Sequence, residues 1–334
     1  MKDLIIGRRD FIRLPLIGLC FSLSGCQLNV KRPILSAYPG VLPKDLTKTL
    51  PFPWSFKSFK DQQIDAVDRF KSTKNYDLLA IGDGWLQTLN MESFAPFVSR
   101  DSIIPLNNQA RSFLSNFETE IATKLLPIAL SPWAMLFRNG KEWMPKANET
   151  WEVLLEPGLR KQVILPNSSR VVMSLADRIG GSEVLRKLRL QVKTYDDRNA
   201  LNWLISGKAK VVVMPLQNCM SVMSKDPRLT LAIPTEGTLL NWTLLLKTNR
   251  AMENFPVTWI QEINKMPLLE KLLLQGWMPP SSSLEILKRT NSLEEMKSPL
   301  LLFLEKGLEK SWSLSPLNEF TRTNLEERWL NSTP

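Results

Sequence analysis

The chain has 334 residues, of which 43% are hydrophobic and 23% are charged, a composition typical of a globular protein and not of a disordered or fibrous one. It contains no histidine, which excludes Ser-His-Asp and Cys-His catalytic groups and His-ligated zinc, and its three cysteines are too few for a disulfide framework or a metal cluster. The net charge of +10 suits an anionic membrane, an anionic ligand or nucleic acid, and does not choose among them.

Residues 1–25 have the order of an export signal. Arg8 and Arg9 precede an apolar run over 14–23, and small residues then lead to Cys26. The run is too short to cross a bilayer core of roughly 30 Å. R-R-D-F-I resembles the twin-arginine export motif, and L-S-G-C resembles the lipobox, whose cysteine becomes the lipidated N-terminus. The alternatives are an ordinary basic segment and an unmodified cysteine.

We therefore expect a signal peptide over 1–25 and a tether over 26–32 that begins with lipidated Cys26. The mature chain would be exported and held on the periplasmic side of a bacterial membrane. Export also argues against nucleic acid as a partner.

Strands and helices alternate along the rest of the chain, which predicts an α/β fold with mostly parallel strands. The expected strands are 34–37, 76–81, 163–165, 210–214, 229–233 and 242–246. The expected helices are 60–71, 170–179, 182–190 and 196–205, followed by helical segments from residue 255 onward.

Ligands of open α/β sheets bind beyond the carboxyl ends of the strands, so polar and aromatic residues just past each strand are candidate site residues. They are Tyr38, Asp83, Trp85, Ser168, Ser169, Arg170, Gln217, Asn218, Asn241 and Trp242. Trp133 is added as a second stacking wall.

Each candidate also has a structural interpretation. Asp83 is either a contact for a cationic group or a turn residue between two glycines. The tryptophans are either stacking walls or core residues. Ser168 and Ser169 either bind an anion with Arg170 or cap the helix that follows. Cys219 is expected to be a buried thiol, since no base is available to activate it.

Several segments, in order, resemble the extracellular solute-binding proteins of ATP-binding-cassette importers, particularly the spermidine/putrescine-binding branch. The segments are YDLLAIGDGWL from Tyr76, LPIALSPWAMLFRN from Leu126, TWEVLLEPGLRKQV from Thr150, LISGKAKVVVM from Leu204 and DPRLTLAIPTEGT from Asp226. The resemblance implies two α/β lobes joined by crossover strands with the solute in a cleft between them, lobe 1 being 33–128 plus 240–334 and lobe 2 being 129–239. It also implies lobe closure that signals to a membrane permease.

The sequence departs from that branch where its members hold a cationic ligand. Asn167 and Arg170 stand where two acids are expected, Asn241 and Thr243 where a tryptophan and an aspartate are expected, and a desolvated ammonium needs such carboxylates. The ligand is therefore expected to differ from a polyamine. The neighbouring ferric-ion branch fits poorly, because only three tyrosines are present.

The sequence thus favours a monomeric, lipid-anchored solute receptor that works with permease subunits, without enzymatic activity, cofactor or metal. Two alternatives stay open: an enzyme on the same two-lobed fold, and a lipoprotein scaffold that binds no solute.

Overall fold

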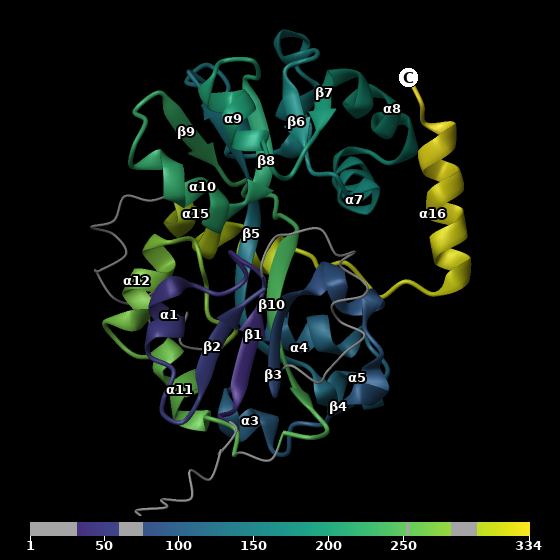
Figure 1. Cartoon of the computed structure of the whole chain (residues 1–334). Coiled ribbons are helices and arrows are strands. Elements are labelled where there is room, and N and C mark those ends of the chain that lie inside the picture. The colour runs from purple at the N-terminus through teal and green to yellow at the C-terminus, as the bar shows by residue number, and fades with distance from the viewer. Residues whose placement is uncertain (1–31, 60–75, 252–253, 282–298) are drawn as a thin grey trace, which may run out of the picture. The chain divides into compact units, whose positions relative to one another are not determined.

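The computed structural model describes residues 32–59, 76–251, 254–281 and 299–334 (Figure 1). The predicted signal peptide, Cys26 and the predicted helix over 60–71 lie outside the described residues. From residue 33 onward the chain forms one compact unit. No helix among the described residues has the length and apolar character needed to span a membrane.

Ten strands of the described chain form a continuous sheet in the order β2-β1-β3-β10-β5-β8-β6-β7, with β4 paired to β10 and β9 paired to β5. The strands are β1 (Ile34–Ala37), β2 (Ser55–Ser58), β3 (Leu78–Gly82), β4 (Phe94–Ala95), β5 (Leu126–Arg138), β6 (Val163–Leu165), β7 (Val192–Tyr195), β8 (Val211–Pro215), β9 (Leu229–Ala232) and β10 (Leu240–Thr248).

Strand β5 belongs to both halves of this sheet. Its first part pairs with β10, from Leu126 to Pro132, and its second part pairs with β8 and β9, from Trp133 to Arg138. Pro132 has no N–H to donate, and it lies where the strand changes partners, so no ladder bond is lost there. β5 is thus one crossover between two lobes, and residues 233–239, between β9 and β10, are the other (Figure 1).

Helices cover both lobes. Those before β5 are α1 (Lys44–Lys48), α3 (Arg100–Ile103), α4 (Asn108–Ser115) and α5 (Thr119–Lys124), with 3₁₀ helices at Asp83–Thr88 and Met91–Ser93. Between β5 and β9 lie α6 (Met144–Ala147), α7 (Ser169–Ile179), α8 (Ser182–Gln191), α9 (Ala200–Ile205) and α10 (Leu216–Met223), with 3₁₀ helices at Trp151–Leu155 and Pro157–Leu159. After β10 come α11 (Val257–Gln261), α12 (Leu268–Leu274), α15 (Pro299–Lys306) and α16 (Glu319–Asn331), with 3₁₀ helices at Glu262–Asn264 and Leu308–Lys310.

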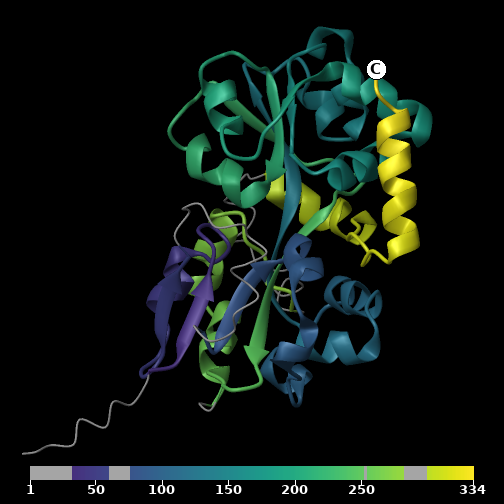
Figure 2. The same cartoon turned by 45° about the vertical axis from the view of Figure 1, so that its right-hand side comes forward.

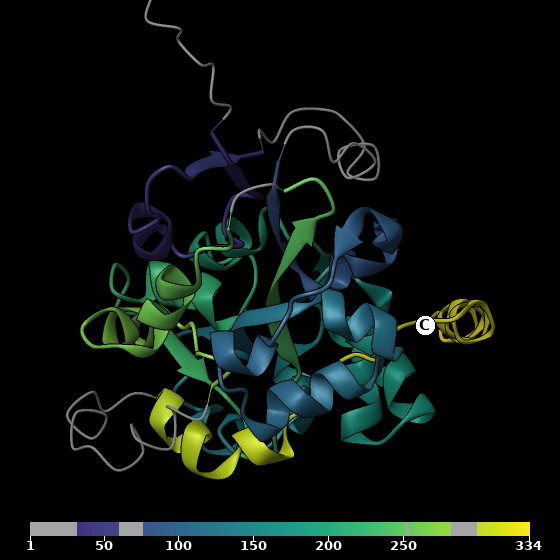
Figure 3. The same ribbon diagram turned by 90° about the horizontal axis from the view of Figure 1, so that it is seen from below.

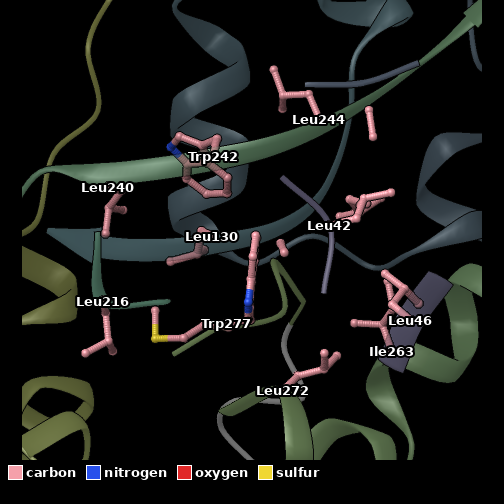
Figure 4. Close-up of a cluster of buried hydrophobic side chains, with 14 of the residues drawn as sticks. Leu42, Leu46, Leu130, Leu216, Leu240, Trp242, Leu244, Ile263, Leu272 and Trp277 are labelled. Carbon is pink, nitrogen blue, oxygen red and sulfur yellow. The ribbon is translucent and has the colours of Figure 1, made fainter. Parts of the chain in front are cut away.

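Two hydrophobic clusters form the core, and they share the strands of the second lobe. In β8 the side chains of Val212 and Met214 join the first cluster, while those of Val211 and Val213 join the second. This alternation explains the unbroken apolar run of the strand, since both of its faces are buried. Figure 4 shows the first cluster passing from Leu46 and Trp242 to Leu216 on α10.

The C-terminal segment connects the two lobes a third time. The Gln109 side chain on α4 donates to the Leu308 carbonyl oxygen, and the Trp312 N–H donates to the carbonyl of Thr238 in the second crossover. Beyond it, α16 runs beside the second lobe (Figures 1 and 2). Arg328 on α16 forms an ion pair with Asp177 on α7. The predicted lobe boundaries stay a prediction. The last helix, α16, which that prediction assigns to lobe 1 as part of 240–334, packs on α7 of the second lobe.

The prediction of mostly parallel strands is wrong, because the two long crossing strands β5 and β10 pair antiparallel with all their neighbours: five of the nine strand pairings of the described chain are antiparallel and four are parallel. Most predicted elements of the described chain are present with small shifts at their ends. The predicted helix over 196–205 is shorter, because Asp196 accepts hydrogen bonds from the N–H groups of Arg198 and Asn199 and forms a turn before α9. Several elements were not predicted, namely the strands β2, β4, β5 and β7 and the helices α1, α3, α4, α5, α6 and α10. β2 and β7 illustrate why. Both are short and largely exposed or half-buried, so they lack the apolar run that marks a strand.

Candidate functional site

Asp83 lies at the carboxyl end of β3, where the first lobe faces the second. Thr243 on β10 pairs with Gly82, and the backbone N–H of Trp242 donates to Asp83 Oδ1 over 3.3 Å. Burial raises the pKa of Asp83 to about 6, against the lowering effect of that hydrogen bond and of the Arg170 charge. The carboxyl group therefore titrates around pH 6 and is largely ionised at pH 7.5.

Two aromatic rings follow the carboxyl ends of β1 and β3. Tyr38 follows β1 and Trp85 lies two residues after Asp83, and their rings stack at 5.8 Å with an interplanar angle of 19°. Trp85 is 38% exposed, unlike most of the large aromatic residues of the described chain. Aromatic rings at a partly exposed position can contact a planar or cationic group.

Arg170 contributes a charge from the second lobe. It lies in the first turn of α7, it is half-buried, and its pKa is lowered by burial while the charge of Asp83 opposes that effect. Among the described residues the two groups form no ion pair within 4.0 Å. The structure therefore brings a carboxyl group of one lobe and a guanidinium of the other into electrostatic range without pairing them.

Ser168 caps α7, and Ser169 is exposed. Ser168 Oγ accepts a hydrogen bond from the N–H of Val171 at 3.4 Å, which is the capping interpretation of this serine. Ser168 Oγ thus already accepts a hydrogen bond within α7. The N–H of Asn167 donates to Asp197 Oδ1.

Gln217 and Asn218 lie in the first turn of α10. The N–H of Gln217 donates to Ser131 Oγ on β5, and a Cβ at Gly276 would lie 2.8 Å from the same nitrogen. The Gln217 side-chain oxygen is buried without a hydrogen-bond partner, and Asn218 is exposed. These contacts join Gln217 to β5 and to the segment after α12, and not to Asp83.

Trp242 and Trp133 are core side chains, which corrects their assignment as walls of an open site. Trp242 is fully buried, and its indole ring stacks on the ring of Phe113 with 4.7 Å between the ring centres. The indole N–H, as distinct from the backbone N–H that donates to Asp83, donates to Ser313 Oγ. Trp133 is 9% exposed and packs in the second cluster. Asn241 is half-buried and pairs with Ser131 in the ladder between β10 and β5.

Sequence reasoning missed a second carboxylate, Asp197. It follows β7, and it accepts from Asn167 in the loop after β6, so it lies beside the start of α7. The pair of acids Asp196 and Asp197 after Tyr195 could have indicated this position. Because a helix was predicted from Asp196, the strand β7, which ends at Tyr195, was not recognised, and Asp197 was not considered as a residue that follows a strand.

Other sites among the described residues are less well formed. No cluster of three or more Asp, Glu or Cys side chains there could hold a metal ion. Cys219 is buried, and burial raises the pKa of its thiol, as expected for an unreactive cysteine.

No family model matches the sequence, and no curated protein matches it. Solved structures do match its fold. A putative spermidine/putrescine transporter from Listeria monocytogenes is 16% identical with a TM-score of 0.58 and covers 90% of this chain and 98% of its own. This chain has the two-lobed fold of periplasmic solute-binding proteins.

Two further structures support this conclusion. A spermidine/putrescine substrate-binding protein from Streptococcus pneumoniae is 13% identical with a TM-score of 0.62 and covers 90% of this chain and 98% of its own. A transporter substrate-binding protein from Agrobacterium tumefaciens is 14% identical with a TM-score of 0.64 and covers 91% of this chain and 95% of its own. The expected two-lobed α/β fold is confirmed.

Proposed function

We propose that this chain is the solute receptor of an ATP-binding-cassette importer, exported, anchored by lipid at Cys26, and presenting a small polar solute to permease subunits. The observation that carries the proposal is that Asp83 and Arg170, one from each lobe, are close enough for the charge of each to act on the other without forming an ion pair. Opposite charges of two lobes that are left unpaired are suited to a solute that bridges them.

The solute would carry a carboxylate, a phosphate or a similar strong acceptor for Arg170. Charge-assisted hydrogen bonds from a half-buried guanidinium typically contribute about 1.5 to 3 kcal/mol. Asp83 and the Tyr38–Trp85 pair would receive a hydrogen-bond donor, a cation or a planar group on the other side. Ser169, Gln217, Asn218 and Asn241 stay proposed contacts at the periphery of the site.

Mass spectrometry of small molecules retained by the natively purified protein would identify the solute. Arg170→Ala should then weaken its binding by roughly ten- to a hundredfold. Arg160→Ala, an exposed arginine of the same lobe, is the matched control and should leave the Kd unchanged. A bound solute without an acceptor group, or an unaltered Kd in Arg170→Ala, would refute the assignment of this arginine.

Spermidine and putrescine should bind weakly, with a Kd above roughly 100 µM. The reason is that Asn167, Arg170 and Thr243 stand where the spermidine-binding branch is expected to have acids, so the carboxylates that a desolvated ammonium needs are missing there. Calorimetry showing sub-micromolar polyamine affinity would contradict this expectation.

The anchor is tested separately from solute binding. Two or more acyl chains, at about 0.8 kcal/mol per buried CH₂, would hold the protein on the membrane. Cys26→Ala should therefore release the chain into the soluble fraction while the solute affinity stays the same. Unchanged membrane association of that variant would rule out the lipid anchor.

A further inference from the structure

Trp312 belongs to the C-terminal segment, and its backbone is bonded to the second crossover. Its N–H donates to the carbonyl oxygen of Thr238 over 3.0 Å, and its own carbonyl oxygen accepts from the N–H of Leu240 over 2.8 Å. Leu239, between these two residues, pairs with Trp312 in a parallel bridge. The hydroxyl of Thr238 donates in turn to the carbonyl oxygen of Trp133 on β5 over 2.7 Å. The backbone of Trp312 is therefore fixed to the second crossover and, through Thr238, to β5.

The side chain of Trp312 extends from this crossover onto α7. Its indole N–H donates to Ser174 Oγ over 2.7 Å, and the guanidinium carbon of Arg178 lies 5.3 Å from the centre of the indole ring. Arg178 also donates to the carbonyl oxygen of Glu236, again in the second crossover. A ring held by a hydrogen bond at its edge and by a cation over its face has little freedom to turn. The half-buried indole thus connects the crossover to the middle of α7.

Ser174 lies one helical turn after Arg170. In an α-helix the N–H of each residue bonds to the carbonyl oxygen four residues earlier, and residues four apart lie on the same face. Val172 and Leu175 of α7 are fully buried in the second cluster, so the helix moves with the core of the second lobe. A contact that places Ser174 relative to the crossover therefore places Arg170 as well.

The last helix, α16, makes a second and weaker contact with α7. The chain continues from Trp312 into α16, which Figure 3 shows end-on, outside the helices that cover the sheet. Arg328 of α16 forms the ion pair with Asp177, whose side chain is 51% exposed. An ion pair with so exposed a partner does little to fix a geometry. The hydrogen bond from Trp312 is therefore the contact that places α7 relative to the crossover.

We infer that Trp312 is a positioning residue, which fixes Arg170 relative to Asp83 of the first lobe through its hydrogen bond to Ser174. This role needs no contact between Trp312 and the solute. The inference deepens the proposed function and rests on it for the role of Arg170 in binding. A change in the angle of the crossover would be passed by the indole to the guanidinium that is proposed to hold the acceptor group of the solute.

The pKa of Asp83 reports on the position of Arg170 without any solute. The charge of Arg170 lowers this pKa, as do hydrogen bonds from the backbone N–H groups of Trp242 and Gly84, while burial raises it. A guanidinium that moves away from the carboxyl group therefore lets the pKa rise. NMR of isotope-labelled carboxyl carbons, titrated on the full chain, measures the pKa, and the signal that is missing from Asp83→Asn identifies the group.

Two variants delete the same hydrogen bond from its two ends. Trp312→Phe keeps an aromatic ring and removes the N–H, and Ser174→Ala removes the acceptor. Arg170→Ala should raise the pKa of Asp83 by roughly 1 unit, and each of these variants should raise it by a smaller amount. The double variant should raise it no further than one of them alone, because both delete one bond. In the Arg170→Ala background Trp312→Phe should change nothing, since no guanidinium is left to move.

Two controls separate positioning from a general loss of structure. Ser174→Thr keeps a hydroxyl and should leave the pKa of Asp83 at its wild-type value. Trp259→Phe removes an indole N–H that donates to the carbonyl oxygen of Leu46 over 2.9 Å and joins α11 to α1 within the first lobe, and it should also leave the pKa unchanged. An equal rise in Trp259→Phe would overturn the positioning role.

The inference is also overturned if the pKa of Asp83 does not rise in Trp312→Phe and Ser174→Ala, or if the rise persists without Arg170. Ser174→Ala alone carries the test if Trp312→Phe does not fold, since it removes only a hydroxyl from a half-buried position on α7. A solute Kd that is unchanged in Arg170→Ala would refute the binding role of this arginine. The titration tests the contact alone, so the two failures are distinguishable.

Discussion

Replacing Asp83 by asparagine should stabilise the protein at neutral pH, because burial makes the ionised carboxylate costly. The folded-state pKa of about 6 lies about two units above the ordinary value of 3.8. At about 1.36 kcal/mol per unit, the penalty is at most about 3 kcal/mol once the group is ionised in both states. Asparagine keeps an oxygen for the N–H of Trp242 and carries no charge.

The sign of the pH dependence follows from the raised pKa. Protonated Asp83 is favoured in the folded state, so its contribution to stability is complete below about pH 4 and is lost as the pH rises through about 6. The advantage of Asp83→Asn should therefore be largest at about pH 7.5, roughly half as large at about pH 5, and nearly absent below about pH 4.

Urea unfolding at these pH values and constant ionic strength measures the effect. Asp226→Asn is the control of opposite sign, because hydrogen bonds from Arg228 lower the pKa of Asp226 to about 2. That substitution should not stabilise the protein. A loss of stability in Asp83→Asn at about pH 7.5, or a difference from the wild type that does not vary with pH, would refute the reasoning.

Three further changes test the local structure. Ser168→Ala removes the cap of α7 and should cost about 1 kcal/mol in urea unfolding. Gly276→Ala should cost about 2 to 4 kcal/mol, since its φ is +81° and a Cβ would lie 2.8 Å from the nitrogen of Gln217, whereas Gly84→Ala meets nothing within 4 Å and should be nearly neutral. Arg328→Ala should change global stability by less than about 1 kcal/mol but speed hydrogen exchange across α16, and unchanged exchange would show that its ion pair does not hold the helix.

The elements best predicted from the sequence are those whose residues are buried in a regular pattern. β6 was predicted over Val163–Leu165, where all three residues are buried, and α7 has a capping serine and an apolar stripe. β5 could not be recognised from periodicity, because its side chains are buried on both faces and prolines interrupt it. Only the family resemblance marked that segment as a crossover.

The candidate site was predicted less well, for a different reason. Position after a strand selected Tyr38, Asp83, Trp85 and Arg170, and their role in binding stays a prediction; the structure stacks Tyr38 on Trp85 and places Asp83 within the electrostatic influence of Arg170. The same rule also selected Trp242, whose indole turns into the core and donates to Ser313, a residue 71 positions further along the chain. A hydrogen-bond partner so far along the chain does not affect the local sequence pattern. The sequence therefore could not decide whether Trp242 lines the binding site or lies in the core.

The placement of α16 makes the C-terminus a reporter for the second lobe. Arg189 on α8 donates to the carbonyl of Trp329 and to Ser332 Oγ, and its guanidinium lies 4.1 Å from the Trp329 ring centre. A fluorophore attached after Pro334 would travel with this lobe, and a second one on the first lobe, at Asn108 for instance, would complete a donor–acceptor pair. Energy transfer between them would report any change in the distance between the two lobes, with both labels outside the candidate site.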